Sequence, residues 1–253
     1  MLKKSVTIEN HHQKFKPRVE DKYILTKPML NAVRTYLQGK SRCRTFLHST
    51  SLVNSLYLDN HSLSRVEHNL AGIAKREKLR IRWYDTKSPE NYCYLELKQR
   101  NGKCISKERW CFHTSYLQKG AIFNIPSKEV MEIIPDALAC SLKDGNIPIL
   151  IVRYRREHFQ LEQLPVRITL DYALKTVRVK PFSPFSPLGI ERSFGCPILE
   201  IKYEPEHGEE FQKMNYLSPF NLRKSRYSKY LQACKALGPI VGKHADTIDQ
   251  DGR

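Results

Sequence analysis

Residues 78–84 read Lys-Leu-Arg-Ile-Arg-Trp-Tyr, and this stretch decides the fold of the chain. In an extended strand successive side chains point to opposite faces, so Lys78, Arg80 and Arg82 share one face and the apolar side chains share the other. Taken alone, such a strand is typical of a half-buried sheet with its charges in water. The same alternation recurs in at least five further stretches. This repetition predicts a sheet with one charged face and one aliphatic face.

The size and charge of the chain limit its class. It has 253 residues, of which 40% are hydrophobic, so it can bury the core of one large domain. Its 43 lysines and arginines against 26 acidic residues give a formal charge of +17. Such a surplus predicts an anionic partner, such as nucleic acid, a phosphate polymer or lipid headgroups. We expect a flexible N-terminal arm over residues 1–14, a single domain over 15–237 and a polar tail over 238–253.

No segment predicts export, membrane insertion or a structural metal site. Residues 1–10 lack an apolar signal core, and the longest apolar run, Ile147 to Val152, is far shorter than the roughly 20 residues that span a bilayer. The seven cysteines are scattered without a Cys-x-x-Cys pair, which indicates free thiols rather than zinc ligands or disulfides. We therefore expect a cytoplasmic protein.

Strand and turn signals predict a mainly β (α+β) fold. Strand-like stretches occur at residues 15–25, 51–59, 76–84, 92–100, 103–111, 148–160, 165–172 and 198–203. Asn101-Gly102 is the strongest hairpin signal, so the strands on either side of it are antiparallel neighbours. About eight antiparallel strands suggest a closed barrel, whose interior can hold side chains or one ligand. We interpret the proline-rich stretch 173–196 as a functional lid or rim loop that can include a short strand over 175–180.

The direction of the charged face decides the function. If the aliphatic side chains pointed inward, the cations would form a solvated surface. If the charges point inward, helices must cover the aliphatic outer face. Predicted helices at 27–38, 127–142 and 224–237 each offer an apolar stripe for that covering role. We therefore expect an eight-stranded antiparallel closed barrel with a charged interior and helices packed on the outside.

A cationic interior would be strained when empty. Alternate residues of a strand lie about 7 Å apart, and two like charges at that distance repel by roughly 2 kcal/mol at an effective dielectric of 20. The interior must then hold water, counter-ions or a polyanion. Guanidinium forks bind phosphate oxygens in pairs, and lysines supply mobile point charges. The ligand that suits this lining best is a nucleoside triphosphate or a chain of phosphates. The predicted lining is Lys78, Arg80, Arg82, Lys98, Lys107, Arg109, Arg156 and Arg167.

Eight short motifs, in a fixed order over residues 15–235, resemble those of a known family. They are Arg18-Val19-Glu20-Asp21-Lys22-Tyr23, Leu79-Arg80-Ile81-Arg82, Leu95-Glu96-Leu97-Lys98, Ser106-Lys107-Glu108-Arg109, Tyr154-Arg155-Arg156, Val166-Arg167-Ile168-Thr169-Leu170-Asp171, Leu199-Glu200-Ile201-Lys202 and Ser228-Lys229-Tyr230. The set is similar to the VTC domain, the polyphosphate polymerase domain of the vacuolar transporter chaperone complex. That domain is related to the triphosphate tunnel (CYTH-like) metalloenzymes.

The resemblance implies an activity and a site. It implies a barrel that takes ATP, transfers the γ-phosphoryl group to a growing polyphosphate chain and threads the product through its interior. The implied cofactor is a divalent metal, usually Mn²⁺, with Mg²⁺ as the other choice, and Glu200 matches the metal-ligating carboxylate. The residues that match the triphosphate-holding positions are Arg80, Arg82, Lys98, Lys107, Arg156 and Arg167. Further substrate-binding positions are Lys22, Arg109, Arg226 and Lys229.

Several alternatives stay open. The first strand has Glu20 and Lys22 but not the full Glu-x-Glu-x-Lys signature of triphosphatases and cyclases, which favours polymerisation over hydrolysis. A polyanion-binding module without catalysis is the second hypothesis, and a triphosphatase or nucleotide cyclase is the third. Glu200 could instead be a plain ion-pair partner of Lys202 or Arg167, and Glu96 is more simply such a partner than a metal ligand.

The expected partners are ATP and polyphosphate. A nucleic-acid binder would interleave aromatic side chains with its cations, whereas here aliphatic residues alternate with them, so we expect no nucleic-acid partner. The sensing domain and membrane region of the eukaryotic polymerases are not in this sequence. We therefore expect no membrane insertion by this chain, and transfer of the product across a membrane would need a separate membrane partner.

Overall fold

A computed structural model of the chain describes residues 12–39, 43–102, 104–114, 134, 136–142, 145–180 and 183–238. The strands are β1 (His12–Ile24), β2 (Cys43–Asp59), β3 (Lys75–Tyr84), β4 (Tyr92–Asn101), β5 (Cys104–His113), β6 (Ile147–Leu161), β7 (Arg167–Lys180), β8 (Ser183–Ser193) and β9 (Ile198–Tyr203). The α-helices are α1 (Lys27–Gly39), α2 (Ser64–Leu70), α5 (Asp136–Leu142), α6 (Gly208–Lys213) and α7 (Lys229–Leu237), and short 3₁₀ turns are at Pro205–His207 and Ser218–Phe220.

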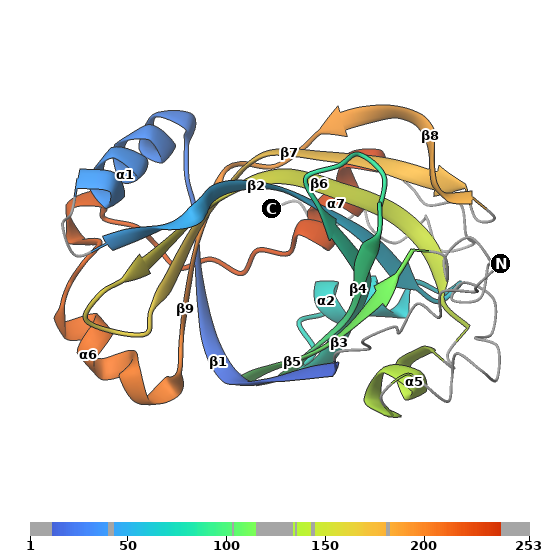
Figure 1. Cartoon of the computed structure of the whole chain (residues 1–253), viewed down its shortest axis with the longest axis horizontal. Coiled ribbons are helices and arrows are strands. Elements are labelled where there is room, and N and C mark those ends of the chain that lie inside the picture. The colour runs from blue at the N-terminus through green and yellow to red at the C-terminus, as the bar shows by residue number, and fades with distance from the viewer. Residues whose placement is uncertain are drawn as a thin grey trace, which may run out of the picture.

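The strands form a closed antiparallel barrel (Figure 1). The sheet order is β6-β2-β3-β4-β5-β1-β9-β7-β8, and a further pairing between β6 and β7 closes the ring, which leaves β8 outside it on β7. The barrel therefore has eight strands, and the predicted fold class is confirmed. The predicted hairpin is also confirmed, because Asn101 pairs with Cys104 and Gly102 has a φ of +59°.

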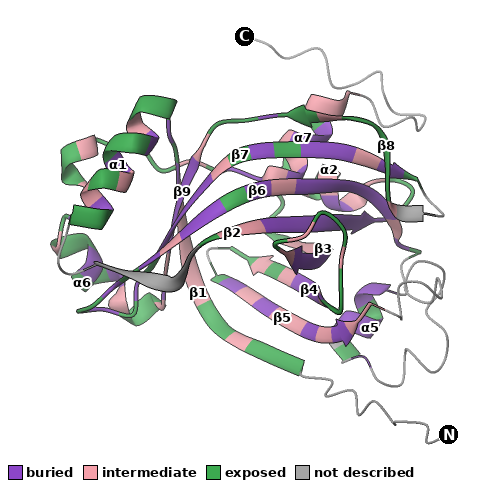
Figure 2. Ribbon diagram, turned by 45° about the horizontal axis from the view of Figure 1, so that its top comes forward, coloured by how far each residue is buried: buried purple, intermediate pink, exposed green. Residues whose placement is uncertain are grey.

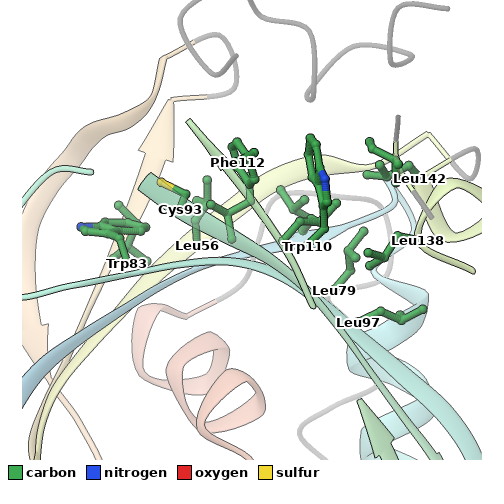
Figure 3. Packing of buried hydrophobic residues seen from close by; sticks show 14 of the residues in the cluster. Leu56, Leu79, Trp83, Cys93, Leu97, Trp110, Phe112, Leu138 and Leu142 are labelled. Carbon is green, nitrogen blue, oxygen red and sulfur yellow. The ribbon is translucent and has the colours of Figure 1, made fainter. Parts of the chain in front are cut away.

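The charged face of each strand points into the barrel. In register, Arg80 lies opposite Glu96 and Glu96 lies opposite Arg109, while Lys22 lies opposite Glu200. Residues directly opposite each other in a ladder point to the same face of the sheet. The alternating apolar residues Leu79, Ile81, Leu95 and Leu97 are all fully buried on the outer face, where α5 packs against them (Figure 3).

Helices pack on the outer face in two places. A cluster that includes Leu138 and Leu142 of α5 packs on the outer side of β2 to β5. A second cluster brings Leu30, Val33 and Leu37 of α1 together with Phe211 of α6 over the outer side of β1, β7 and β9. Figure 2 shows the resulting alternation of buried and exposed residues along the strands. Of the predicted helix at 127–142, residues 136–142 form α5, and residues 127–133 and 135 lie outside the described residues.

The prediction that the helix over 224–237 packs on the outer face of the barrel was wrong. The helix begins at Lys229, and Tyr230 stacks on Tyr57 with ring centroids 4.5 Å apart and planes 4° apart. Tyr57 lies directly opposite Arg80 and therefore faces inward. Because Leu150 and Val152 also face inward on β6, this part of the interior is apolar, and α7 covers it. In Figure 1 the segment that leads into α7 runs across the ring of strands.

The loop predicted over 173–196 was also wrong, apart from its short strand at 175–180, which is confirmed. Residues up to Lys180 continue β7, and Ser183–Ser193 return along it as β8. Prolines are tolerated in β8 because it is an edge strand, paired on one side only. The predicted arm over 1–14 and tail over 238–253 lie outside the described residues, apart from residues 12–14, which begin β1, and Gly238.

Candidate functional site

One carboxylate inside the barrel is surrounded by four cations. The Glu96 side chain is fully buried, and its oxygens lie 2.8 Å from Arg80 Nη2 and 2.8 Å from Arg109 Nη2. Lys107 Nζ is 2.5 Å away and Arg82 Nη1 is 3.6 Å away. Burial by itself raises the pKa of Glu96, but these four positive charges hold it well below its usual range. Glu96 is therefore an anion that keeps the cationic lining together.

A second charged group lies where β1 meets β9. Glu200 Oε2 is 2.9 Å from Lys202 Nζ and 3.2 Å from Arg156 Nη2, and Glu200 Oε1 is 3.7 Å from Lys22 Nζ. Glu20, directly opposite Lys202, lies 2.5 Å from Lys98 Nζ. Burial raises the pKa of Glu20, yet Lys98 and the other nearby lysines lower it to about 2, against the effect of Glu200. Two ionised carboxylates thus lie close together inside the barrel.

The start of α7 adds a cation to the lining. Lys229 Nζ lies 2.6 Å from Asp171 Oδ2, and Arg156 donates two hydrogen bonds to the same carboxylate. Burial opposes the charged form of Lys229, but Asp171 raises the pKa of the lysine above its ordinary value. The segment before α7 is held on β1, where Ser225 N donates to Lys22 O. The C-terminal segment is thereby part of the site.

Three lysines of the lining lie directly opposite one another on neighbouring strands. Lys78 lies opposite Lys98, and Lys98 lies opposite Lys107. Lys78 Nζ donates to Ser228 Oγ at 2.7 Å. Burial, with the charges of Lys22 and Lys98, lowers the pKa of Lys78 well below its ordinary value. Burial also lowers the pKa of Lys98 to about 8, although Glu20 favours its charged form. This part of the lining is complementary to an anion.

The structure brings most of the predicted site residues together. Arg80, Arg82, Lys107 and Arg109 meet at Glu96; Lys22 and Arg156 meet at Glu200; Lys98 meets Glu20; and Lys229 meets Asp171. Arg167 lies opposite Lys202 on the same inner face, and its side chain is exposed. Arg226 is exposed, and burial together with the charges of Arg100 and Arg226 lowers the pKa of Arg76 near the start of β3.

Sequence reasoning left several members of the lining out of the predicted site. Glu20 and Lys202 were interpreted as paired charges of the lining but were not placed among the site residues, and Asp171 was passed over. The strand alternation places all three on the charged face, so that signal could have found them. Ser228 gave no comparable signal, because its contact with Lys78 depends on where α7 packs.

The carboxylates of the described residues suit a divalent metal whose remaining ligands come from a bound substrate. Within the ranges that the structure describes, no three His, Cys, Asp or Glu side chains form a group that could hold a metal ion by themselves. Magnesium in phosphoryl-transfer sites is commonly bound by one or two carboxylates plus the phosphate oxygens of the substrate. Glu200 and Glu20 are two ionised carboxylates on neighbouring strands. The donor set therefore fits a metal whose coordination is completed by phosphates.

An eight-stranded antiparallel barrel with buried arginines and lysines in its interior is a triphosphate tunnel fold. Residues 17–238 match the VTC domain. The chain belongs to the VTC domain family, which is a family of phosphate-handling enzymes. No curated protein is similar enough to this chain to count as a relative.

Solved structures resemble the fold at low sequence identity. A candidate adenylate cyclase from Bacillus halodurans is 18% identical with a TM-score of 0.55, over 85% of this chain and 95% of that one. A candidate adenylyl cyclase from Hippeastrum, described as having a dominant triphosphatase activity, is 15% identical with a TM-score of 0.48, over 87% and 96% of the two chains. A Pyrococcus horikoshii protein is 15% identical with a TM-score of 0.43, over 85% and 96%. The first of these likenesses supports the tunnel fold alone.

No helix in the part of the chain that the structure describes is both long and apolar enough to cross a lipid bilayer.

Proposed function

We propose that this protein is an ATP-dependent polyphosphate polymerase, which transfers the γ-phosphoryl group of ATP to a growing polyphosphate chain inside the barrel. The observation that carries this proposal is the composition of the lining, in which cations outnumber carboxylates and in which lysines face lysines across neighbouring strands. Like charges directly opposite each other are unfavourable unless an anion lies between them. A linear polyanion would contact many of these cations at once.

The reaction needs no nucleophilic side chain. A terminal oxygen of the acceptor phosphate attacks the γ-phosphorus of ATP, a new P–O bond forms, and the bond to the β,γ-bridging oxygen breaks. The electron pair of that bond stays on the departing ADP. Catalysis of this kind rests on positioning and on neutralisation of charge. Arg80, Arg82 and Lys107 would hold the phosphates at one end of the lining, and Arg156, Lys22 and Lys229 would hold them near Glu200.

A divalent metal, with Mn²⁺ as the first choice and Mg²⁺ as the second, would be held by Glu200 and Glu20 together with phosphate oxygens. When bound, it would neutralise charge on the phosphates and orient them. In its absence Glu200 and Glu20 keep the neighbouring cations Lys22, Lys98 and Lys202 in place. The plain ion-pair role of Glu200 and its role toward a metal are therefore not exclusive.

A triphosphatase is the second candidate, and the pair of ionised carboxylates favours it. Hydrolysis needs a positioned water molecule, and a metal held by Glu20 and Glu200 could supply one. Arg18, which lies 3.4 Å from Glu20 Oε1, stands where the triphosphatase signature has its first glutamate. An arginine at that position removes a metal-binding carboxylate and adds a phosphate-binding cation, which favours the polymerase. We further propose a cytoplasmic location and a separate membrane partner if the product crosses a membrane.

The test is incubation of the purified full chain with ATP and Mn²⁺, with polyphosphate, free phosphate and cyclic AMP all measured. Formation of polyphosphate together with ADP supports the polymerase. Free phosphate without polyphosphate supports the triphosphatase, and cyclic AMP supports a cyclase. Tight polyphosphate binding without any turnover supports a binding module and overturns the proposal.

A further inference from the structure

A buried hydroxyl inside the barrel has no partner among the residues that the structure describes. Thr169 is 1% exposed, and its Oγ1 makes no hydrogen bond there. Leaving a buried hydroxyl unsatisfied costs stability, and valine has nearly the same shape without that cost. A threonine at this position therefore needs an explanation beyond packing.

The register of β7 places this hydroxyl on the charged inner face. Thr169 lies directly opposite Glu200 on β9 and directly opposite His158 on β6. Its neighbours along the strand, Ile168 and Leu170, pack on the outer face beneath α1 and α6. Thr169 therefore lies across from Glu200, which forms an ion pair with Arg156, in the part of the interior that carries the charges.

The groups around Thr169 already have partners. The imidazole of His158 lies 3.0 Å from Ser51 Oγ through Nε2. Burial, followed by the charge of Arg156, lowers the pKa of His158 to about 4, so this ring is neutral near pH 7. Arg156 is engaged by Asp171 and Glu200. The Thr169 hydroxyl therefore lies among charged groups that are paired with one another, and no described residue accepts its hydrogen bond.

We propose that Thr169 contacts the substrate directly, donating the hydrogen of its hydroxyl to a phosphate oxygen of the bound triphosphate or polyphosphate. The inference rests on one part of the proposed function, namely that the ligand is a phosphate chain. It applies equally to a polymerase and to a triphosphatase. A phosphate oxygen is anionic, and hydrogen bonds to charged acceptors are stronger than those between neutral groups. The contact is made without a metal, which separates it from the role of Glu200.

The chain offers a matched control on the same strand. Thr176 is also 1% exposed, and its hydroxyl also lacks a partner among the described residues. It lies opposite Val152, which packs in the apolar cluster with α7 rather than among the charges. Thr176→Val therefore removes the same group from the same strand without removing a contact to a phosphate chain.

The experiment is titration of the full-length protein with inorganic tripolyphosphate in EDTA and again in Mn²⁺, for the parent, Thr169→Val, Thr169→Ser and Thr176→Val. In EDTA we expect Thr169→Val to bind about tenfold more weakly, with Thr169→Ser and Thr176→Val close to the parent. The melting temperature of Thr169→Val should equal or exceed that of the parent, because the unsatisfied hydroxyl is gone. A loss of affinity caused by unfolding would instead lower it.

The remaining outcomes either overturn the inference or separate it from the proposed function. Equal affinities of Thr169→Val and the parent in EDTA would exclude the contact. A loss seen only in Mn²⁺ would assign the hydroxyl to the metal instead of the phosphate. A parent that does not bind tripolyphosphate would remove the ligand class itself and the proposed function with it. Weaker binding by Thr169→Val in a protein that forms no polyphosphate from ATP would support the contact and refute the polymerase.

Discussion

Lys78 of β3 and Lys98 of β4 lie directly opposite each other on the inner face of the barrel. Lys78 donates a hydrogen bond to Ser228 Oγ and Lys98 forms an ion pair with Glu20, so Glu20 is the one carboxylate that the described residues place against this pair. Two lysines in this relationship repel each other, and the repulsion disappears if one is neutral or if an anion lies between them. The pair therefore links the protonation of the lining to the binding of a polyanion.

Binding of tripolyphosphate should be accompanied by proton uptake at Lys78. Burial and the charges of Lys22 and Lys98 lower its pKa well below the ordinary value of 10.5, and a bound polyanion favours the charged form again. At pH 8 we expect the parent to take up more protons on binding than Lys78→Met does. Calorimetric titration in two buffers of different ionisation enthalpy measures this difference. Identical proton uptake by the two proteins would contradict the prediction.

The same lysine should lower stability near neutral pH. The unfolded chain holds the proton of Lys78 up to about its ordinary pKa, whereas the folded protein binds it less tightly, so stability rises as the pH rises toward 10.5. Lys78→Met should therefore be more stable than the parent at pH 7, and the difference should shrink above pH 10. Urea unfolding at both pH values measures it. A parent that is the more stable protein at pH 7 would argue against a depressed pKa.

Glu96→Gln should destabilise the protein by about 3–5 kcal/mol, because it removes the anion from a buried group of four cations. Thermal unfolding measures the loss. Tripolyphosphate should raise the melting temperature of this variant more than that of the parent, since the ligand supplies the missing negative charge. Glu108→Gln is a suitable control, because Glu108 is on the outer face of β5, next to Lys14 and His12. Equal stability of the two variants would refute the central role of Glu96.

Glu200→Gln should lower turnover of ATP about a hundredfold or more while leaving binding of tripolyphosphate in EDTA nearly intact. The reason is that the three cations around Glu200 remain available to phosphate after the carboxylate is gone. The difference between the affinities in Mn²⁺ and in EDTA should also decrease, which calorimetry can follow. If both the turnover and the effect of Mn²⁺ persist, Glu200 is only an ion-pair partner.

Gly195→Ala should be more damaging than Gly189→Ala, although both glycines have positive φ values, +61° and +90°. A Cβ at residue 195 would lie 2.0 Å from the hydroxyl of Tyr227, whereas a Cβ at residue 189 would meet no atom within 4 Å. We expect Gly195→Ala to be the less stable by about 1–3 kcal/mol, as measured by urea unfolding. Tyr227 O accepts a hydrogen bond from Lys22, so the variant should also weaken tripolyphosphate binding. Equal stability of the two variants would contradict the clash.

Local patterns predicted most of the strands and the side chains that share a face. The Asn-Gly pair and the alternation in β3, β4 and β9 depend on backbone geometry over a few residues, and these predictions are confirmed. The proline-rich stretch was misjudged because an edge strand tolerates prolines that a central strand does not. The side of the barrel on which α7 packs was misjudged because an apolar stripe fits any apolar surface, and the inner face of β2 and β6 is partly apolar.

The sequence by itself determined that Lys78, Arg80 and Arg82 share one face, since the period of a strand is two residues whatever surrounds it. The tertiary structure alone decided that this face points inward and which carboxylate each cation meets. Lys98 pairs with Glu20, and Lys229 pairs with Asp171, each across a large part of the chain. These contacts depend on the closure of the barrel between β6 and β7 and on the register around it, which no local pattern encodes. The position of Thr169 beside Glu200 has the same origin.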